Sequence, residues 1–362
     1  MLTFSPPKSR LENLLALTVE KEASDLHLTC GLPPSLRVDG DITPLEADPL
    51  RADDLASILE NLLDEEQGRR LKKRRVVELA TETDLGRFRI SVFYTRGNVS
   101  ASFRRISPLR SFEELGLPVI VKEVAERLDG LVLVSGAVGM GKSTTLAYII
   151  DLINRRRRAR VFTVEDPIEY VHESKRSTVL QLEVGLDTPS FSHALRACFR
   201  QDPNVICVGE MRDYRTVSMA LKAAETGHLV LSTLHTGTAV ATVDRIIDMF
   251  PPHQQHQARM TMSHVLQAVI CQKLLPRHRS EGRVLAYEVL TANSAVRRMI
   301  KDGKEDQLPN LLDIGKDRGM VSMDHSLYNL CQAKAITYRT AMAHCHDPAR
   351  FRDLEPLDDR ED

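Results

Sequence analysis

A glycine-rich segment, "GAVGMGKSTT" at residues 136–145, has the residue types needed to hold a chain of phosphates. Glycines let successive backbone N–H groups turn towards one point, a lysine adds positive charge, and a hydroxyl side chain is a ligand for Mg²⁺. An apolar run precedes the segment and a helical pattern follows it, as such a loop requires. The sequence therefore predicts a nucleotide-binding loop formed by Gly136, Ala137, Val138, Gly139, Met140, Gly141, Lys142, Ser143 and Thr144, with Ser143 also binding the metal.

Two carboxylates stand where other apolar runs end. Glu165 closes "VFTVE" and Glu210 follows "VICVG". Ligands of a parallel sheet bind at the carboxyl ends of its strands, so both residues are predicted beside the phosphate loop. Hydrolysis of ATP needs a group that activates or positions water and groups that stabilise charge. We expect these roles for Glu165 and Glu210, and metal binding for Glu210, although position 209 is glycine rather than the aspartate usual in ATP-hydrolysing proteins.

Two histidines flank a further apolar run in "ETGHLVLSTLHT". His228 comes at its start and His235 at its end. A single histidine is more often a structural residue of the core than a functional group. At the edge that carries the phosphate loop, however, His235 is predicted to sense the terminal phosphate and transmit its loss.

The patterns around these residues indicate an α/β fold with two different halves. In the second half, continuous apolar runs at residues 131–134, 161–164, 205–208 and 229–231 alternate with helical segments, which is typical of a buried parallel sheet. Beyond residue 252 the pattern is mainly helical, apart from one strand at 284–290. The first half predicts a helix at 10–22, a hairpin around Asp39–Gly40, a helix at 53–71 and two further strands, "RFRISVFY" and "VSASFRRI". We predict domains at 1–105 and 121–290, a linker at 106–120, a helical region at 291–350 and a disordered tail at 351–362.

Composition narrows the class of protein. Apolar residues make up 42% and charged residues 27% of the 362 residues, as in globular proteins. The 49 Lys and Arg residues nearly balance 50 Asp and Glu residues, which argues against a nucleic-acid partner. No apolar run approaches the ~20 residues of a membrane span, and the first residues have no export pattern. We therefore expect a cytoplasmic protein.

Four ordered motifs resemble those of a known superfamily. "GAVGMGKST", "VEDPIEYVHE", "DPNVICVGEMRD" and "AETGHLVLSTLHT" are similar to the Walker A, Asp box, Walker B and His box of the secretion ATPases, in particular the type IV pilus retraction ATPases of the PilT/PilU family. "SDLHLTCGLPPSLRVDGDI" and "GRFRISVFYTRG" resemble that family's N-terminal domain. The resemblance implies a PAS-like N-terminal α/β domain followed by a RecA-like P-loop NTPase core with a helical C-terminal region.

The resemblance also assigns roles to residues. The family's Walker B strand ends in Gly-Glu, so Glu210 remains the Walker B acid, Glu165 matches the glutamate that activates water, and His228 and His235 match the His-box pair. ATP is expected between the two domains. Arginines of the N-terminal domain would complete the site, and the matching positions are Arg87, Arg89, Arg96 and Arg104, of which we favour Arg89 and Arg104.

By this resemblance the protein is expected to be a hexameric ATPase at the inner face of the cytoplasmic membrane. It would act on a membrane platform protein to retract pili in twitching motility. The chain has no four-cysteine zinc spacing like that of the pilus assembly motors, which favours retraction over extension. "SAVRRMIKDGK" matches the family's "AIRxLIRE" helix only in part. An accessory, PilU-like subunit that works with a paralogous retraction ATPase therefore remains an alternative, as does a motor of another secretion system or one that moves DNA.

Overall fold

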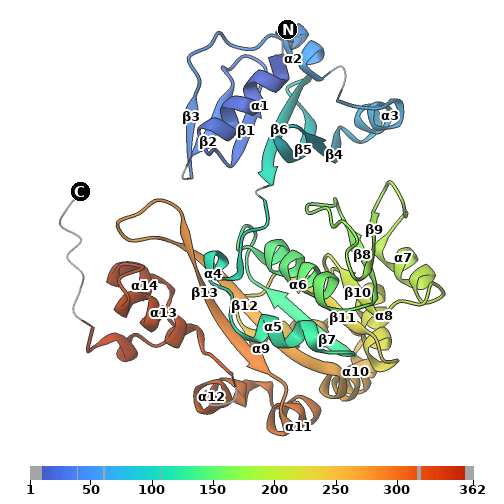
Figure 1. Ribbon diagram of the computed structural model, residues 1–362, viewed down its shortest axis with the longest axis vertical. Helices are drawn as coiled ribbons and strands as arrows, with labels where there is room; N and C mark the ends of the chain where they lie inside the picture. Colours follow the sequence, from blue (N-terminus) through green and yellow to red (C-terminus); the bar gives the residue numbers. More distant parts are fainter. Residues whose placement is uncertain (1–9, 39, 60–61, 107, 316–318, 355–362) are drawn as a thin grey trace. The chain divides into compact units, whose positions relative to one another are not determined.

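The computed structural model describes residues 10–38, 40–59, 62–106, 108–315 and 319–354. The chain divides into two compact units, residues 1–108 and 109–362, which are described separately (Figure 1). The segment predicted as a linker at 106–120 includes α4 (Phe112–Leu115), and α5 (Ile120–Glu126) begins at its end. The second unit therefore begins with two short helices.

In the first unit, six strands of the described residues form an antiparallel sheet in the order β3-β2-β1-β6-β5-β4. The elements are α1 (Arg10–Glu20), β1 (Asp25–Leu28), β2 (Ser35–Val38), β3 (Asp41–Pro44), α2 (Ala52–Leu59), α3 (Glu65–Arg74), β4 (Val76–Thr83), β5 (Gly86–Thr95) and β6 (Asn98–Ile106). The single helix predicted at 53–71 is two helices, because Asp64 and Gln67 form a capping box that begins α3. The predicted hairpin is formed by β2 and β3, although Asp39 lies outside the described residues.

One face of this sheet carries the core of the unit. Phe88, Ile90 and Val92 of β5 are fully buried and alternate with polar residues that point to the other face. Leu15 of α1 and Leu55 of α2 belong to the same buried cluster. The strand predicted for "RFRISVFY" is therefore confirmed, and its alternating residues face the core.

In the second unit, seven strands of the described residues form one sheet in the order β13-β12-β7-β11-β10-β8-β9. All neighbouring pairs are parallel except β12 and β13. The strands are β7 (Gly130–Ser135), β8 (Arg160–Glu165), β9 (Thr178–Glu183), β10 (Val205–Val208), β11 (Leu229–Leu234), β12 (Leu266–Pro276) and β13 (Arg283–Thr291). The four predicted apolar runs lie in β7, β8, β10 and β11.

The prediction that residues beyond 252 are mainly helical is wrong for residues 266–276, which form β12. Residues 268–271 are all buried because both faces of the sheet are covered here. The strand therefore lacks the polar alternation that marks a half-buried strand, and its apolar run reads equally well as a buried helix.

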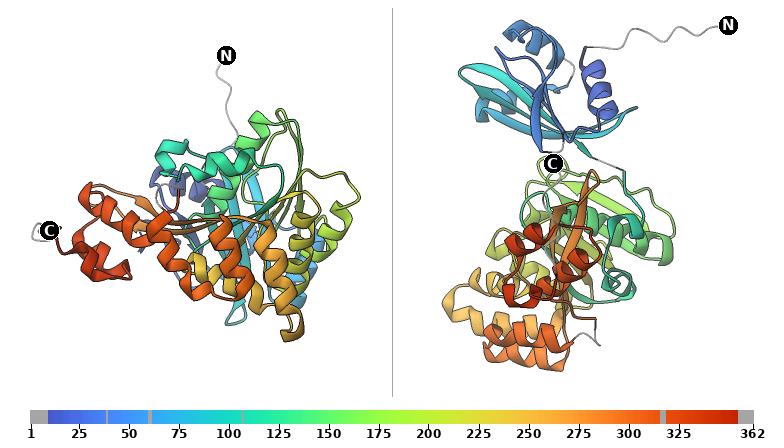
Figure 2. Two further views of the ribbon diagram at one scale, coloured as in Figure 1. Left: turned by 90° about the horizontal axis from the view of Figure 1, so that it is seen from below. Right: turned by 90° about the vertical axis from the view of Figure 1, so that its left-hand side faces the viewer.

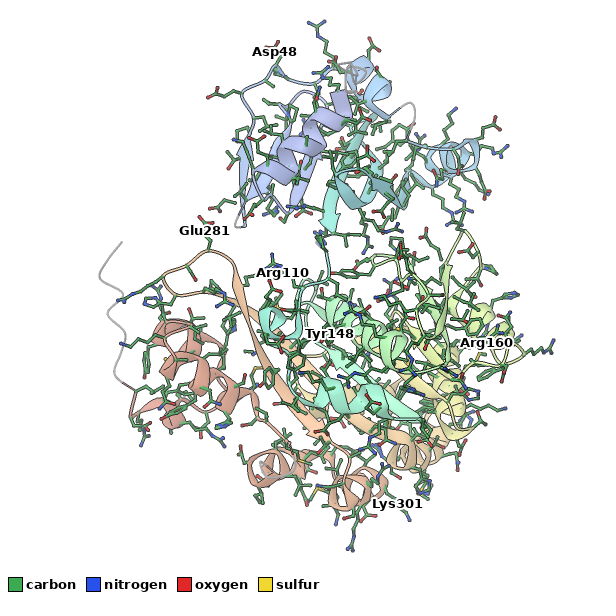
Figure 3. All side chains as sticks on the ribbon, viewed as in Figure 1. Asp48, Arg110, Tyr148, Arg160, Glu281 and Lys301 are labelled. Atoms are coloured by element: carbon green, nitrogen blue, oxygen red, sulfur yellow. The ribbon has the colours of Figure 1, made fainter. Side chains whose placement is uncertain are left out.

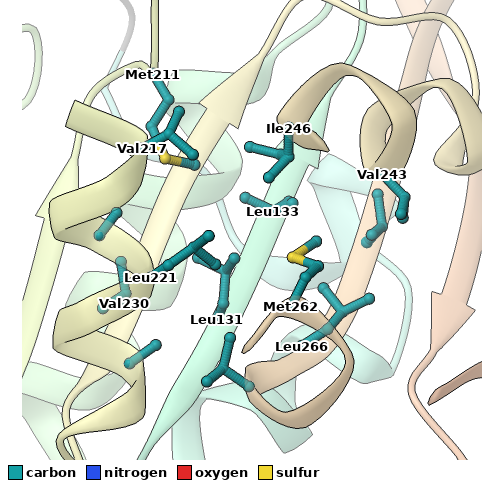
Figure 4. Packing of buried hydrophobic residues seen from close by; sticks show 14 of the residues in the cluster. Leu131, Leu133, Met211, Val217, Leu221, Val230, Val243, Ile246, Met262 and Leu266 are labelled. Atoms are coloured by element: carbon teal, nitrogen blue, oxygen red, sulfur yellow. The ribbon is translucent and has the colours of Figure 1, made fainter. Parts of the chain in front are cut away.

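Helices cover both faces of this sheet (Figure 2). Leu131 and Leu133 of β7 face a cluster that includes Val217 and Met262, shown in Figure 4. Val132 of β7 faces the other cluster, with α5 and α6. The helices that flank the sheet are α6 (Lys142–Arg156), α7 (Phe191–Cys198), α8 (Tyr214–Glu225), α9 (Ala239–Asp248) and α10 (Pro252–Val265).

The remaining residues form a helical region beside β13 (Figure 1). It consists of α11 (Ser294–Asp302), η1 (Glu305–Gln307), α12 (Leu308–Ile314), α13 (Met323–Gln332), α14 (Tyr338–His344) and η3 (Pro348–Phe351). The disordered tail was predicted to begin at 351, and this start is wrong because Phe351 is fully buried in a cluster with Leu327 and Ile336. Residues 355–362 lie outside the described part. Within the described ranges, no helix has both the length and the apolar character to cross a membrane.

Candidate functional site

The glycine-rich loop lies between the end of β7 and the start of α6, as its sequence predicted. Gly136 has a φ of +143°, and a Cβ atom there would lie 2.5 Å from the backbone oxygen of Gln272. Gly141 has a φ of +80° at the N-cap of α6, a conformation that glycine adopts without a steric cost. The shape of the loop thus depends on these two glycines. The free N–H groups at the start of α6 favour an anion there.

Lys142 is a buried lysine directed at this loop. Lys142 is 8% exposed, and its Nζ atom donates to the backbone oxygens of Gly136 at 2.9 Å and Ala137 at 2.8 Å. Burial lowers the pKa of Lys142, and the negative charge of Glu210 opposes that shift. The ammonium group is therefore held where phosphate oxygens could replace the backbone oxygens as its partners.

His235 connects Lys142 to Glu210. Its Nδ1 atom lies 3.3 Å from Nζ of Lys142, and its Nε2 atom lies 3.3 Å from Oε2 of Glu210. Glu210 also forms an ion pair with Arg212. The parallel pairing of β10 with β11 and of β11 with β7 places these residues at one edge, since all three strands end there. The structure therefore brings together three of the predicted site residues.

Glu165 ends β8 at the same edge and is held by two side chains. Its Oε1 atom accepts hydrogen bonds from Oγ1 of Thr163 at 2.6 Å and from Nε2 of Gln181 at 3.1 Å. Burial raises the pKa of Glu165, and these two hydrogen bonds partly offset the shift. A carboxylate with a raised pKa in a fixed orientation suits a general base.

Sequence reasoning missed both partners of Glu165. Thr163 stands two positions earlier in β8, on the same face of the strand, so a period of two would have identified it. Gln181 lies in β9, which was not predicted. Its amide donates to the oxygen of Tyr170 at 2.8 Å and accepts from the N–H of His172 at 2.7 Å, so its own orientation is also fixed.

Position 209 holds a glycine where ATP-hydrolysing proteins usually have an aspartate. Its N–H donates to the oxygen of Val164 at 2.8 Å. A Cβ atom on Gly209 would lie 3.1 Å from that oxygen and 3.5 Å from Cα of Glu165. Glycine therefore lets the ends of β8 and β10 approach closely, so that Glu165 and Glu210 share one edge.

The hairpin of β12 and β13 supports the loop from beside β7. Gln272 and Thr145 are both buried, and their side chains are joined by contacts of 3.1 and 2.8 Å. The N–H of Leu274 donates to Sδ of Met140 at 3.1 Å, and Arg283 donates to the oxygen of Gly139 at 3.3 Å. In Figure 3, the labelled residue Glu281 lies in the loop that connects β12 to β13. Gln272 could not be identified from the sequence because β12 itself was missed.

The predicted metal ligands are Ser143 and Glu210. In the described ranges there is no cluster of three or more His, Cys, Asp or Glu side chains suited to a metal ion. Mg²⁺ usually keeps several waters and binds through a few protein oxygens together with phosphates, so a preformed cluster is not required. The exposed Ser143 at the start of α6 and the carboxylate of Glu210 fit that donor set.

Among the other predicted residues of the glycine-rich loop, Thr144 contacts the hydroxyl of Tyr170 at 3.0 Å, whereas Ala137, Val138 and Gly139 are exposed.

The structure does not bring His228 to this edge. His228 immediately precedes β11, and its oxygen accepts from the N–H of Gly130 at the start of β7. Its Nδ1 atom lies 2.9 Å from the oxygen of Ala223. The six residues of β11 separate it from His235, and they span roughly 20 Å at the usual rise. Within this unit, His228 closes the turn between α8 and β11.

The four predicted arginines belong to the first unit, and Arg87, Arg89 and Arg104 form ion pairs there. Arg89 of β5 and Arg104 of β6 are directly opposite in the register. Arg104 pairs with Asp25 at 2.9 Å and Arg89 with Glu78 at 2.7 Å. Arg87 pairs with Glu82 at 3.2 Å, and Arg96 lies in the turn between β5 and β6 with a φ of +49°. Their role at a nucleotide remains a prediction.

Comparisons with known proteins agree with the motifs. The family described as "Type II/IV secretion system protein" matches residues 8–311. PilT of Pseudomonas aeruginosa, named as a type IV pilus retraction ATPase, is 39% identical over 343 residues, which cover 94% of this chain and 99% of PilT. The type IV pilus ATPase PilU of the same organism is 39% identical over 335 residues, or 92% and 88% of the two chains.

A crystal structure of the pilus retraction motor PilT with bound ADP has 44% sequence identity to this chain and a TM-score of 0.85. The similarity covers 95% of this chain and 98% of that one. Equal identity to PilT and PilU of one organism does not separate the two paralogues. The chain belongs to the type II/IV secretion system protein family and, within it, to the group that includes the pilus retraction ATPases PilT and PilU.

Proposed function

We propose that this protein binds ATP with Mg²⁺ and hydrolyses it to power retraction of type IV pili. The observation that carries the proposal is the contact of Lys142 and Glu210 with one histidine, His235, at the edge where Glu165 also lies. This arrangement places a cation for the phosphates, an acid and a candidate base around one glycine-rich loop.

The chemistry follows from the positions of these side chains. Glu165 accepts a proton from water as the water oxygen attacks the terminal phosphate, and the bond from that phosphorus to the bridging oxygen breaks to release ADP. A raised pKa makes Glu165 a stronger base than an exposed carboxylate. Lys142 neutralises charge on the phosphates, and His235 responds to loss of the terminal phosphate through its contacts with Lys142 and Glu210. Mg²⁺, held through Ser143 and near Glu210, supplies further charge neutralisation when it is bound.

The cellular role is proposed from the relatives. The chain would act as a homohexamer on the cytoplasmic face of the inner membrane, against a platform protein of the pilus machine. Arg89 and Arg104 would complete the ATP site from the N-terminal unit.

An accessory subunit, dependent on a paralogous motor, is the second candidate, because identity to PilU equals identity to PilT. Hydrolysis by the purified protein alone distinguishes the two roles. A retraction motor should hydrolyse ATP unaided, whereas an accessory subunit should need its paralogue.

The direct test is steady-state ATPase activity of the full chain and of Lys142→Ala and Glu210→Ala. Lys122→Ala is the matched control, since the partners of this half-exposed side chain, Glu113 at 3.9 Å and the ring of Phe112 at 3.7 Å, both lie in α4. We expect both site variants to lose about 100-fold or more in kcat, and the control to retain activity. A wild-type rate no higher than that of the site variants would refute a self-sufficient motor. The paralogue would then be added to test the accessory role.

A further inference from the structure

Glu288 in β13 is a buried carboxylate to which the proposed chemistry gives no role. It is 5% exposed. Its Oε1 atom accepts from the N–H of Ala239 at 2.7 Å, and its Oε2 atom accepts from the N–H of Met323 at 3.4 Å. Ala239 is the first residue of α9 and Met323 is the first residue of α13. One side chain therefore joins the starts of two helices that lie far apart in the sequence.

The first of these helices is connected to the nucleotide loop. α9 begins four residues after His235, and Thr242 in its second turn is fully buried. The hydroxyl of Thr242 donates to the backbone oxygen of Thr238 at 2.7 Å, and it lies 3.0 Å from Oγ of Ser135 and 2.7 Å from Oγ1 of Thr236. Ser135 immediately precedes Gly136, and Thr236 immediately follows His235. These contacts connect the neighbours of His235 and Gly136 to the start of α9.

The second helix carries the C-terminal cluster. Val289 and Val321 exchange two backbone hydrogen bonds, of 2.8 and 3.1 Å, next to the contact between Glu288 and Met323. Asp324, also buried, accepts from the N–H groups of His346 and Asp347 at 2.8 and 2.9 Å. The start of α13 is therefore attached both to β13 and to the last described turn. We call residues 321–354 the C-terminal body; its buried side chains form one cluster with Leu275 of β12 and Ala286 of β13.

A carboxylate is required for this double contact. It presents two acceptor oxygens and no donor, whereas a glutamine presents one oxygen and an NH₂ group that would face an N–H. Burial raises the pKa of Glu288, and the two backbone hydrogen bonds lower it. The positive ends of two helices compensate a buried negative charge that would otherwise be costly.

We propose that Glu288 is a positioning residue that couples the loop after His235 to the C-terminal body, so that the nucleotide at the glycine-rich loop controls the placement of residues 321–354. This inference rests on the proposed ATPase function. Glu288 does not touch the nucleotide; it acts through the backbone of α9.

The test uses the full chain and the isosteric variant Glu288→Gln. Hydrogen exchange of residues 321–332 is measured with and without Mg²⁺ and a non-hydrolysable ATP analogue, alongside analogue affinity and ATPase kinetics. Glu305→Gln is the matched control, because Glu305 is equally buried at 5% exposure but pairs with Arg259 at 3.0 Å. In wild type and in the control, the analogue should change exchange at 321–332. In Glu288→Gln this change should vanish and kcat should fall about tenfold, with KM and analogue affinity nearly unchanged.

A folded Glu288→Gln that keeps the wild-type exchange response would overturn the coupling. If that variant does not fold, Thr242→Val tests the same path, since it removes the contacts to Ser135 and Thr236 and leaves Glu288 in place. An unchanged response in Thr242→Val would equally overturn it. A wild-type protein that binds the analogue without any response at 321–332 refutes the coupling alone. A wild-type protein that binds no analogue refutes the ATPase proposal and the coupling with it.

Discussion

Replacing Thr163 by valine removes the hydroxyl that donates at 2.6 Å to Oε1 of Glu165, while the size and branching of the side chain are kept. The hydrogen bond favours the ionised form of Glu165 and lowers its pKa, against the larger effect of burial. Without it, the pKa of Glu165 should rise further. Gln181 still donates to the same oxygen at 3.1 Å, so the carboxylate should keep its orientation.

The size of the shift follows from the strength of that hydrogen bond. A hydrogen bond to a charged group contributes roughly 1.5–3 kcal/mol. This energy favours the ionised form of Glu165, so its loss should raise the pKa of Glu165 further in Thr163→Val. Because Glu165 must be ionised to accept a proton, the acidic limb of the rate profile should move to higher pH, and since about 1.4 kcal/mol is a factor of ten, kcat/KM on that limb should fall about tenfold or more. At pH values above the limb, the rate should be nearly that of wild type.

The assay is kcat/KM for ATP hydrolysis measured across the acidic limb, because this parameter reports the pKa of the free enzyme. Thr18→Val is the matched control. Thr18 is fully buried in α1 and donates to the oxygen of Leu14 at 2.8 Å, so the same substitution leaves Glu165 untouched. A limb that stays in place in Thr163→Val, or moves to lower pH, would refute the assignment of Glu165 as the base or its control by Thr163.

Two further predictions concern neighbours of this site. Gly209→Ala places a Cβ atom 3.1 Å from the oxygen of Val164 and should displace Glu165, which should lower kcat about tenfold with little change in KM. Gly68→Ala is the control, because a Cβ atom there meets nothing within 4 Å. Equal kcat in the two variants would contradict the argument. Burial lowers the pKa of His172 from 6.5 to about 4, so between these values the unfolded chain binds more protons and wild type should lose stability as pH falls. Denaturant unfolding should show that this group lowers the free energy of unfolding of wild type by about 2 kcal/mol by about pH 5, and this loss should be absent in His172→Gln. An equal loss in both proteins would count against the role of His172.

Local patterns in the sequence predicted the nucleotide loop and four of the parallel strands that carry it, β7, β8, β10 and β11. These depend on local patterns: glycines at set spacing, apolar runs bounded by turns, and acids where the runs stop. Such patterns act through neighbouring residues, so they can be read along the chain. The strand predicted for "RFRISVFY", which forms β5, likewise follows from a local pattern.

The positions of the two histidines also follow from local geometry. His228 and His235 stand at opposite ends of one strand, and a strand extends about 3.3 Å per residue, so they cannot reach the same edge. Similarity of the motif suggested a pair, whereas the strand itself separates them within the unit.

The polar residues that support the site could be identified only once the strands were placed in the sheet. Gln181 reaches Glu165 across 16 residues of sequence, Gln272 reaches Thr145 across 127, and Glu288 reaches Ala239 across 49. Gln272 and Glu288 are buried and Gln181 is partly buried, and a polar residue in such a position is costly unless another strand or helix provides its partner. That partner depends on the order of strands in the sheet. The order results from packing of the whole unit, and no local pattern in the sequence specifies it.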